Sequence, residues 1–155
     1  MERDGVRVVA RNRKARHEYE ILEDVEAGLV LRGAEVKSLR DGRASFTDAF
    51  ARVENGEAWL YNLHISPYEK ASEAPDPVRR RKLLLNRREL DRLAIETRDT
   101  GVTLVPLDIH FRRGYAKVRL ALARGKKHRD KREDLKRETM KREAQRAMQE
   151  VRRES

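Results

Sequence analysis

Hydrophobic and polar residues alternate in several short stretches of the chain, which is the pattern of half-buried β-strands. The clearest stretch is residues 58–65, where Trp59, Tyr61, Leu63 and Ile65 share one face. It follows residues 54–57, whose central Asn-Gly pair accepts the positive φ angles of a type I′ turn. With residues 50–53 as the first strand, this pattern predicts a β-hairpin.

Four more strands are expected from β-rich runs. Two of them, residues 19–23 and 28–32, are predicted to be separated by an acidic turn. The other two, residues 102–111 and 115–123, flank an Arg-Gly turn. Pro106 has no N–H to donate to a neighbouring strand, so its strand is predicted to lie at an edge or to bulge there.

Two short helices are predicted between these strands. Residues 34–40 form the first, ended by Asp-Gly, and residues 87–98 form the second, with Asn86 as its N-cap and Glu89 completing a capping box. The Pro-rich residues 72–77 read as an exposed loop. Six or so short strands with two helices indicate a mainly β protein, built as a small antiparallel barrel.

Charge divides the 155-residue chain into three segments. Residues 1–17 carry a net charge of +4 and residues 124–155 a net charge of +6, whereas residues 18–123 hold 18 basic and 18 acidic side chains. We therefore expect a partly disordered basic arm (1–17), a barrel domain (18–123) and a basic C-terminal tail (124–155). A neutral body with two basic ends indicates a polyanionic partner.

Nucleic acid is the first candidate for that polyanion. An anionic membrane surface is the weaker one, because no long apolar run or bulky amphipathic face accompanies the charge. The chain has no cysteine, which excludes disulfides and thiolate metal sites. The first residues lack the apolar stretch of a secretory signal, so a cytoplasmic location is expected.

Candidate catalytic groups are few, and no enzyme activity, metal or cofactor is expected. The four histidines show no metal-ligand spacing. His17 and Glu18 could form the acid/base pair of a small endoribonuclease, which is the rival hypothesis, but neighbours on an extended chain point apart. Lys37 and Ser38 could suggest a dyad, but adjacent helical residues do not face each other.

Basic runs and aromatic residues are the candidates for RNA contact. The runs are Arg11, Arg13, Lys14 and Arg16, and then Arg79, Arg80, Arg81 and Lys82. They are predicted to contact phosphates. Of the aromatic residues, Tyr19, Trp59, Tyr61 and Tyr115 are expected mostly in the core, which leaves Tyr68 as the stacking candidate.

Several ordered segments of the chain resemble the SmpB family, the SsrA-binding proteins of bacteria. They include EAGLVLRGAEVKSLRDGRAS (26–45), DPVRRRKLLLNRREL (76–90) and GYAKVRLALARGKK (114–127), and the resemblance runs from about residue 12 to residue 142. It implies an OB-like barrel with flanking helices that binds the tRNA-like domain of tmRNA (SsrA RNA). It also implies delivery of aminoacylated tmRNA, with elongation factor Tu and GTP, to stalled ribosomes.

The resemblance also implies roles for individual residues. The residues expected to face tmRNA are Asn12, Glu26 and Leu84, with Lys37, Ser38 and Arg40 as a looser set. The residues expected to contact ribosomal RNA are Lys126, Lys127, His128, Arg129, Asp130, Lys131 and Arg132. Where the family usually has Tyr or His before the aspartate, this chain has Arg129, whose guanidinium can also stack, and His128 is adjacent.

The tail itself has the composition of a marginal helix. Residues 130–153 contain no Gly or Pro and are rich in helix formers. Their apolar stripe is narrow, so an isolated helix is only marginally stable in water. We expect the tail to be disordered in the free protein. By the resemblance, it becomes helical near the decoding site, in the vacant mRNA channel of the small ribosomal subunit, where it enables tagging of the nascent peptide.

Overall fold

The computed structural model describes residues 5–68, 75–99, 101–126, 142, 145 and 146. The chain divides into two compact units, Met1–Gly125 and Lys126–Ser155, and each is described by itself. In the first unit the strands are β1 (Val6–Arg11), β2 (Tyr19–Leu29), β3 (Ala44–Ser45), β4 (Phe50–Glu54), β5 (Glu57–Tyr61), β6 (His64–Ile65), β7 (Arg81–Leu84), β8 (Val102–Arg112) and β9 (Tyr115–Gly125). The helices are α1 (Ala15–Glu18), α2 (Gly33–Arg40) and α3 (Arg87–Glu96).

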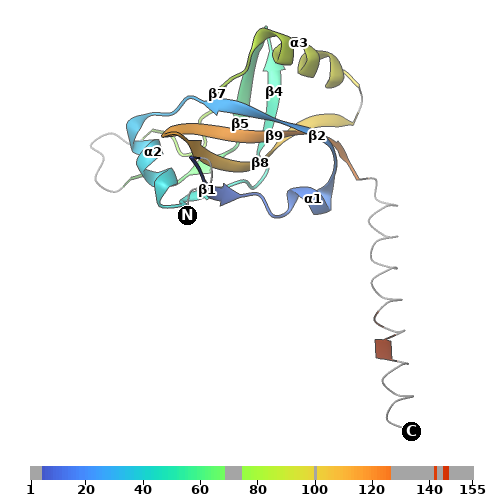
Figure 1. The fold of residues 1–155 in the computed structure, drawn as a ribbon, viewed down its shortest axis with the longest axis horizontal. Helices are drawn as coiled ribbons and strands as arrows, with labels where there is room; N and C mark the ends of the chain where they lie inside the picture. The colour runs from blue at the N-terminus through green and yellow to red at the C-terminus, as the bar shows by residue number, and fades with distance from the viewer. Residues whose placement is uncertain (1–4, 69–74, 100, 127–141, 143–144, 147–155) are drawn as a thin grey trace. The chain divides into compact units, whose positions relative to one another are not determined.

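Six strands close into an antiparallel barrel, as predicted (Figure 1). The order around the ring is β8-β4-β5-β7-β2-β9, and β9 pairs again with β8. β1 pairs with the C-terminal half of β8, and the short β3 and β6 form a separate two-stranded sheet. Closure leaves the six strands without a free edge, which a small β protein must otherwise protect.

The long strand β8 changes its neighbour along its length. Leu104 pairs with β4, whereas residues 108–112 pair with β1, so β8 connects the barrel with the N-terminal strand. On its other side, the register with β9 shifts between Pro106 and Asp108. Of the two alternatives predicted at Pro106, an edge strand or a bulge, this irregularity supports the bulge, because a residue without an N–H cannot continue a regular ladder.

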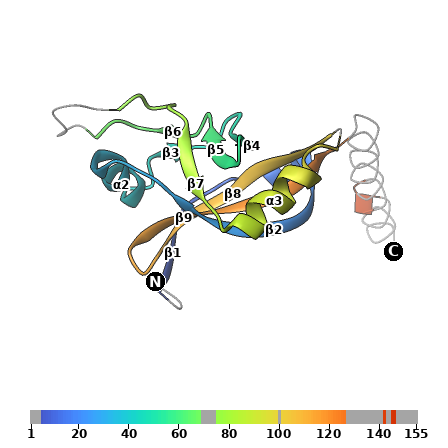
Figure 2. The same ribbon diagram turned by 90° about the horizontal axis from the view of Figure 1, so that it is seen from above.

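The barrel interior is filled by aliphatic side chains from all six strands and from α2 and α3. Fully buried members include Leu39, Leu60, Leu93, Leu104 and Leu120. A second, smaller cluster lies where α1 packs on β8 and β9, with Ala15, Val105 and Ala121 at its centre. In Figure 1 α2 lies at one end of the barrel and α1 near the other, and Figure 2 also shows α2 at its end.

Two expectations about the N-terminal half are wrong. Residues 6–11 form β1 within the sheet, where the charge pattern predicted part of a disordered arm. Residues 19–29 form one continuous strand, where an acidic turn was predicted. The turn is absent because Val25 and Ala27 face the core, while Asp24 and Glu26 find cationic partners on β9 and β8 respectively.

The predicted hairpin is confirmed, but its buried face is not the expected one. Asn55 and Gly56 have φ angles of 50° and 76°, as a type I′ turn requires. The regular strand ends at Tyr61, and Asn62 adopts a left-handed φ of 62°. This shifts the alternation by one residue, so Ala58 and Leu60 are buried before the break, and Leu63 and Ile65 after it.

The four aromatic residues that were expected in the core are consequently not buried there. Trp59, Tyr61 and Tyr19 are half-buried and Tyr115 is exposed, contrary to the expectation from strand spacing. Both predicted helices are present, α2 over residues 33–40 and α3 over residues 87–96, two residues shorter than expected. Asn86 caps α3, since its side chain accepts from the Glu89 N–H at 2.8 Å.

Candidate nucleic-acid interface

The first turn of helix α2 contains Glu35, whose side chain turns back into the protein. The backbone N–H of Arg32 donates to Glu35 Oε1 at 2.9 Å, the reach expected of an N3 glutamate in a capping box. This places the carboxylate in the interior, where Glu35 is only 2% exposed. A buried carboxylate needs charged partners, because its own desolvation is costly.

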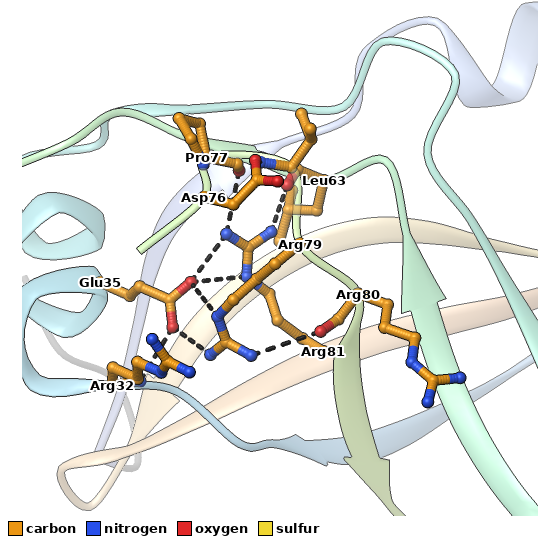
Figure 3. Close-up of polar contacts among 9 residues, drawn as sticks. Arg32, Glu35, Leu63, Asp76, Pro77, Arg79, Arg80 and Arg81 are labelled. Carbon is orange, nitrogen blue, oxygen red and sulfur yellow. Dashed lines mark hydrogen bonds and ion pairs between the residues drawn. The ribbon is translucent and has the colours of Figure 1, made fainter. Parts of the chain in front are cut away.

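Two arginines of the basic run supply those partners (Figure 3). Arg81 Nε donates to Glu35 Oε2 at 2.8 Å, and Arg79 donates to both carboxylate oxygens. Arg81 also donates to the carbonyl oxygens of Leu63 and Pro77. The cluster of Glu35, Arg79 and Arg81 therefore joins α2 to β7, to the segment before β7 and to the residues between β5 and β6.

The ionisation of both partners follows from this geometry. Burial acts to raise the pKa of Glu35, but hydrogen bonds from Arg79, the Arg32 N–H and Arg81 outweigh it and hold the pKa below its ordinary value. Burial lowers the pKa of Arg81, which the hydrogen bond to Glu35 opposes. A guanidinium is not deprotonated in proteins, so the cluster is a buried ion triad.

The basic run at 79–82 is divided by the alternation of a strand. Arg79 and Arg81 point to Glu35, whereas Arg80 points away from it (Figure 3). Arg80 lies over the ring of Trp59, 4.0 Å from its centroid, and Lys82 Nζ is 3.3 Å from Glu57 Oε1. The side chain of Arg81 is fully buried, so it is not available for the phosphate contact predicted for it.

Glu26 lies in β2 and belongs to a charged network on the outside of the barrel. Its Oε2 is 2.9 Å from His110 Nε2, and Arg112 donates to both of its oxygens. His110 is 2% exposed and its Nδ1 is 2.7 Å from Asp108 Oδ1. Burial raises the pKa of Glu26, but the hydrogen bonds from His110 and Arg112 outweigh it and lower the pKa below its ordinary value.

Asn12 and Leu84 occupy different settings. Asn12 is bound to β8 by its N–H on the Leu107 carbonyl at 2.8 Å and by Nδ2 on the Pro106 carbonyl at 2.9 Å. It anchors the segment that carries Arg13 and Lys14. Leu84 is 55% exposed and pairs with Gly28 of β2. A Cβ added to Gly28 would lie only 3.1 Å from the Leu84 Cβ, so the glycine leaves room for this side chain.

The three α2 residues predicted to face tmRNA, Lys37, Ser38 and Arg40, differ in exposure. Lys37 and Arg40 are exposed, with Lys37 Nζ 5.3 Å from the centroid of the Tyr68 ring and Arg40 5.7 Å from that of Phe111. Ser38 is fully buried, and its Oγ has no hydrogen-bond partner among the described residues. Its side chain cannot face RNA directly, so Lys37 and Arg40 are the available pair.

An open groove of about 830 Å³ lies beside Asn12. Its lining includes three cationic residues, two acidic ones and several aromatic or polar ones, namely Arg11, Arg13, Lys14, Glu18, Asp48, Tyr19, Phe46, Phe50, Ser45, Thr47 and Asn62. This combination suits an RNA backbone and an unpaired base. The pattern at 11–14 predicted the cations, but only the fold brings residues 44–50 beside them.

The rival endoribonuclease hypothesis depends on two residues of α1. His17 and Glu18 are exposed neighbours on the four-residue α1. The described residues contain no group of three His, Cys, Asp or Glu side chains that could hold a metal ion. None of the described helices is both long enough and apolar enough to cross a membrane.

Most of the predicted ribosome-binding residues lie outside the described residues. Lys126 is half-buried, and residues 127–132 are not described. In the tail, Arg142, Gln145 and Arg146 are helical and exposed. The prediction of a disorder-to-helix transition stays a prediction.

Comparison with known proteins places the chain clearly. The family model described as SmpB protein matches residues 9–150. SsrA-binding proteins of Enterococcus faecalis and Pelotomaculum thermopropionicum are 54% and 55% identical, over 95% and 94% of this chain and 96% of each relative. A chain of the solved structure described as "tmRNA-SmpB: a journey to the center of the bacterial ribosome" is 61% identical. That alignment has a TM-score of 0.66 and covers 76% of this chain and 84% of that one. The chain thus belongs to the SmpB family.

Proposed function

We propose that this protein is an RNA-binding adaptor of ribosome rescue, whose barrel binds the tRNA-like domain of tmRNA. The observation that carries the proposal is the similarity along nearly the whole chain to SsrA-binding proteins. The 61% identical relative in a tmRNA structure on the ribosome supports it. In this function the protein has no catalytic step of its own, because binding and positioning of RNA are its task.

The barrel surface offers a coherent set of RNA-facing groups. Leu84 supplies an exposed apolar contact beside β2, and Lys37, Arg40 and Arg80 supply exposed cations. Phosphate contacts by such cations position an RNA, and contacts to base edges and stacking specify it. Arg79, Arg81 and Ser38 are assigned instead to holding α2 and β7 in place.

The tail and the delivery factor complete the proposal. Residues 126–132 contact the decoding site of the small subunit, and the following residues enter the vacant mRNA channel as a helix. Thirteen basic side chains over residues 124–155 suit a channel lined with phosphates. Elongation factor Tu with GTP joins through aminoacylated tmRNA, and the complex acts in the bacterial cytoplasm.

Competition binding tests this function. The purified full chain is titrated with labelled tmRNA in the presence of unlabelled tmRNA or bulk tRNA, at a fixed salt concentration. Unlabelled tmRNA should compete far better than bulk tRNA, and the labelled RNA should stay intact. Equal competition would indicate a general RNA chaperone. Cleavage without added factors, lost in His17→Ala, would support the endoribonuclease instead.

A further inference from the structure

The network around Glu26 spans three strands on the outside of the barrel. Asp108, His110 and Arg112 are alternate residues of β8, so their side chains share one face. Glu26 belongs to β2, and β9 lies between the two strands. Its carboxylate reaches past β9 to His110 and Arg112 on β8.

The carboxylate of Glu26 is turned toward these partners. Oε2 is 3.0 Å from both Nε and Nη2 of Arg112 and 2.9 Å from His110 Nε2. Oε1 is 3.2 Å from Arg112 Nε. A carboxylate engaged in this way has little capacity left for a base amino group, and its charge repels a phosphate.

Arg112 has the opposite character. Its side chain is 39% exposed, and no described residue accepts a hydrogen bond from its Nη1. The contacts with Glu26 fix the plane of the guanidinium, which reduces the rotamer entropy lost when a phosphate binds to its remaining N–H groups. His110 is buried behind Glu26 and is held from its other side by Asp108.

We propose that Arg112 contacts a phosphate of the bound RNA and that Glu26 is a positioning residue that acts through Arg112. This inference rests on the proposed function, since tmRNA is the RNA concerned. It gives Glu26 an indirect role in binding. It also explains how a glutamate serves a surface that must attract a polyanion.

A double-mutant cycle on tmRNA affinity tests the inference. Arg112→Ala should weaken binding about tenfold and reduce the slope of log K against log salt by about 0.7 to 0.9, the loss of one phosphate contact. Glu26→Ala should weaken binding by a similar factor. The tmRNA affinity of the double variant should be within about twofold of that of the single variant that binds less tightly, because both changes remove the same contact. Glu26→Gln replaces Glu26→Ala if thermal unfolding shows that the alanine variant is not folded.

The matched control is Arg92→Ala. Arg92 is also 39% exposed and is also paired with a glutamate of β2, Glu23. The Arg92→Ala variant should leave the affinity for tmRNA nearly unchanged. Additive losses in the double variant, about a hundredfold in total, would show that Glu26 contacts RNA independently and would overturn the inference. An unchanged affinity or salt slope in Arg112→Ala would also overturn it. If the unmodified chain does not prefer tmRNA over bulk tRNA, the proposed function itself fails.

Discussion

Glu35 connects helix α2 to two arginines of the basic run at residues 79–82. It caps its own helix, binds two arginines and is almost fully buried. Removing one partner of a buried ion pair is far more destabilising than removing the whole cluster, because it leaves an uncompensated charge. The side chains of Lys37 and Arg40 depend on this cluster only through the position of α2.

Glu35→Ala should therefore destabilise the protein severely. We expect a loss of about 3 to 5 kcal/mol in the free energy of unfolding, because Arg81 would keep its charge in the interior without a carboxylate. Chemical denaturation monitored by circular dichroism measures it. Glu57→Ala is the control, since its pair with Lys82 is surface-exposed and should contribute about 0 to 1 kcal/mol. Similar losses in the two variants would contradict the role assigned to Glu35.

The lowered pKa of Glu35 also predicts how stability depends on pH. In the folded state the pKa is below its ordinary value of 4.5, so the unfolded chain binds the proton more readily. The stabilisation that ionised Glu35 provides is fully present above the pKa that Glu35 has in the unfolded chain. It is lost as the pH falls through the lower pKa that Glu35 has in the folded protein. Thermal midpoints should therefore fall as the pH drops below about 4.5.

Glu35→Gln, which cannot ionise, is the comparison for this pH dependence. It should start from a lower midpoint at neutral pH and lose less on acidification. An acid limb identical to that of the unmodified protein would assign the pH dependence to other carboxylates. Glu26, whose pKa is also lowered, is the next candidate.

At the scale of elements, local signals predicted helix α3 and the β4–β5 hairpin correctly. Helix α3 follows from Asn86 and Glu89, and the hairpin from Asn55 and Gly56, because capping and positive φ are decided within a few residues. The acidic stretch of β2 was predicted as a turn because its neutralising partners lie about 90 residues away. Arg119 binds Asp24 at 2.8 Å, and Arg112 binds Glu26.

The N-cap of α3 provides a test at this scale. Asn86→Ala removes the acceptor of the Glu89 N–H and should cost about 1 kcal/mol of the free energy of unfolding. Asn86→Asp keeps an acceptor at the same place and should be close to neutral. Equal losses in the two variants, measured by denaturant titration, would show that the cap contributes nothing through its side chain.

The whole molecule combines a folded barrel with a basic C-terminal unit. A chain ending at Gly125 retains β9 and therefore every strand of the barrel. It should bind tmRNA but fail to support peptide tagging on stalled ribosomes, which a reconstituted translation assay measures. The full chain is the control. Normal tagging by the truncated chain, or complete loss of tmRNA binding, would contradict this division of labour.

The net charge of +10 leads to a prediction for the whole molecule as well. If about five phosphates are contacted, log K for tmRNA should fall with log salt at a slope of about -3 to -5. Arg80→Ala should make the slope shallower, since its side chain is exposed beside Trp59. A slope near zero would contradict the prediction that basic side chains of the protein contact RNA phosphates.

The sequence by itself determined the barrel class, helices α2 and α3, the type I′ turn and the family. These features follow from alternation, capping, turn chemistry and ordered motifs, all of which are local in the chain. Only the tertiary structure decided which charged residues face outward. The run at 79–82 looks uniformly basic, yet Arg81 is buried against Glu35, 46 residues earlier, while Arg80 is exposed. The physical reason is that a charge is buried only where a partner of opposite sign neutralises it. Here that partner is far away in the sequence, and only the fold brings it close.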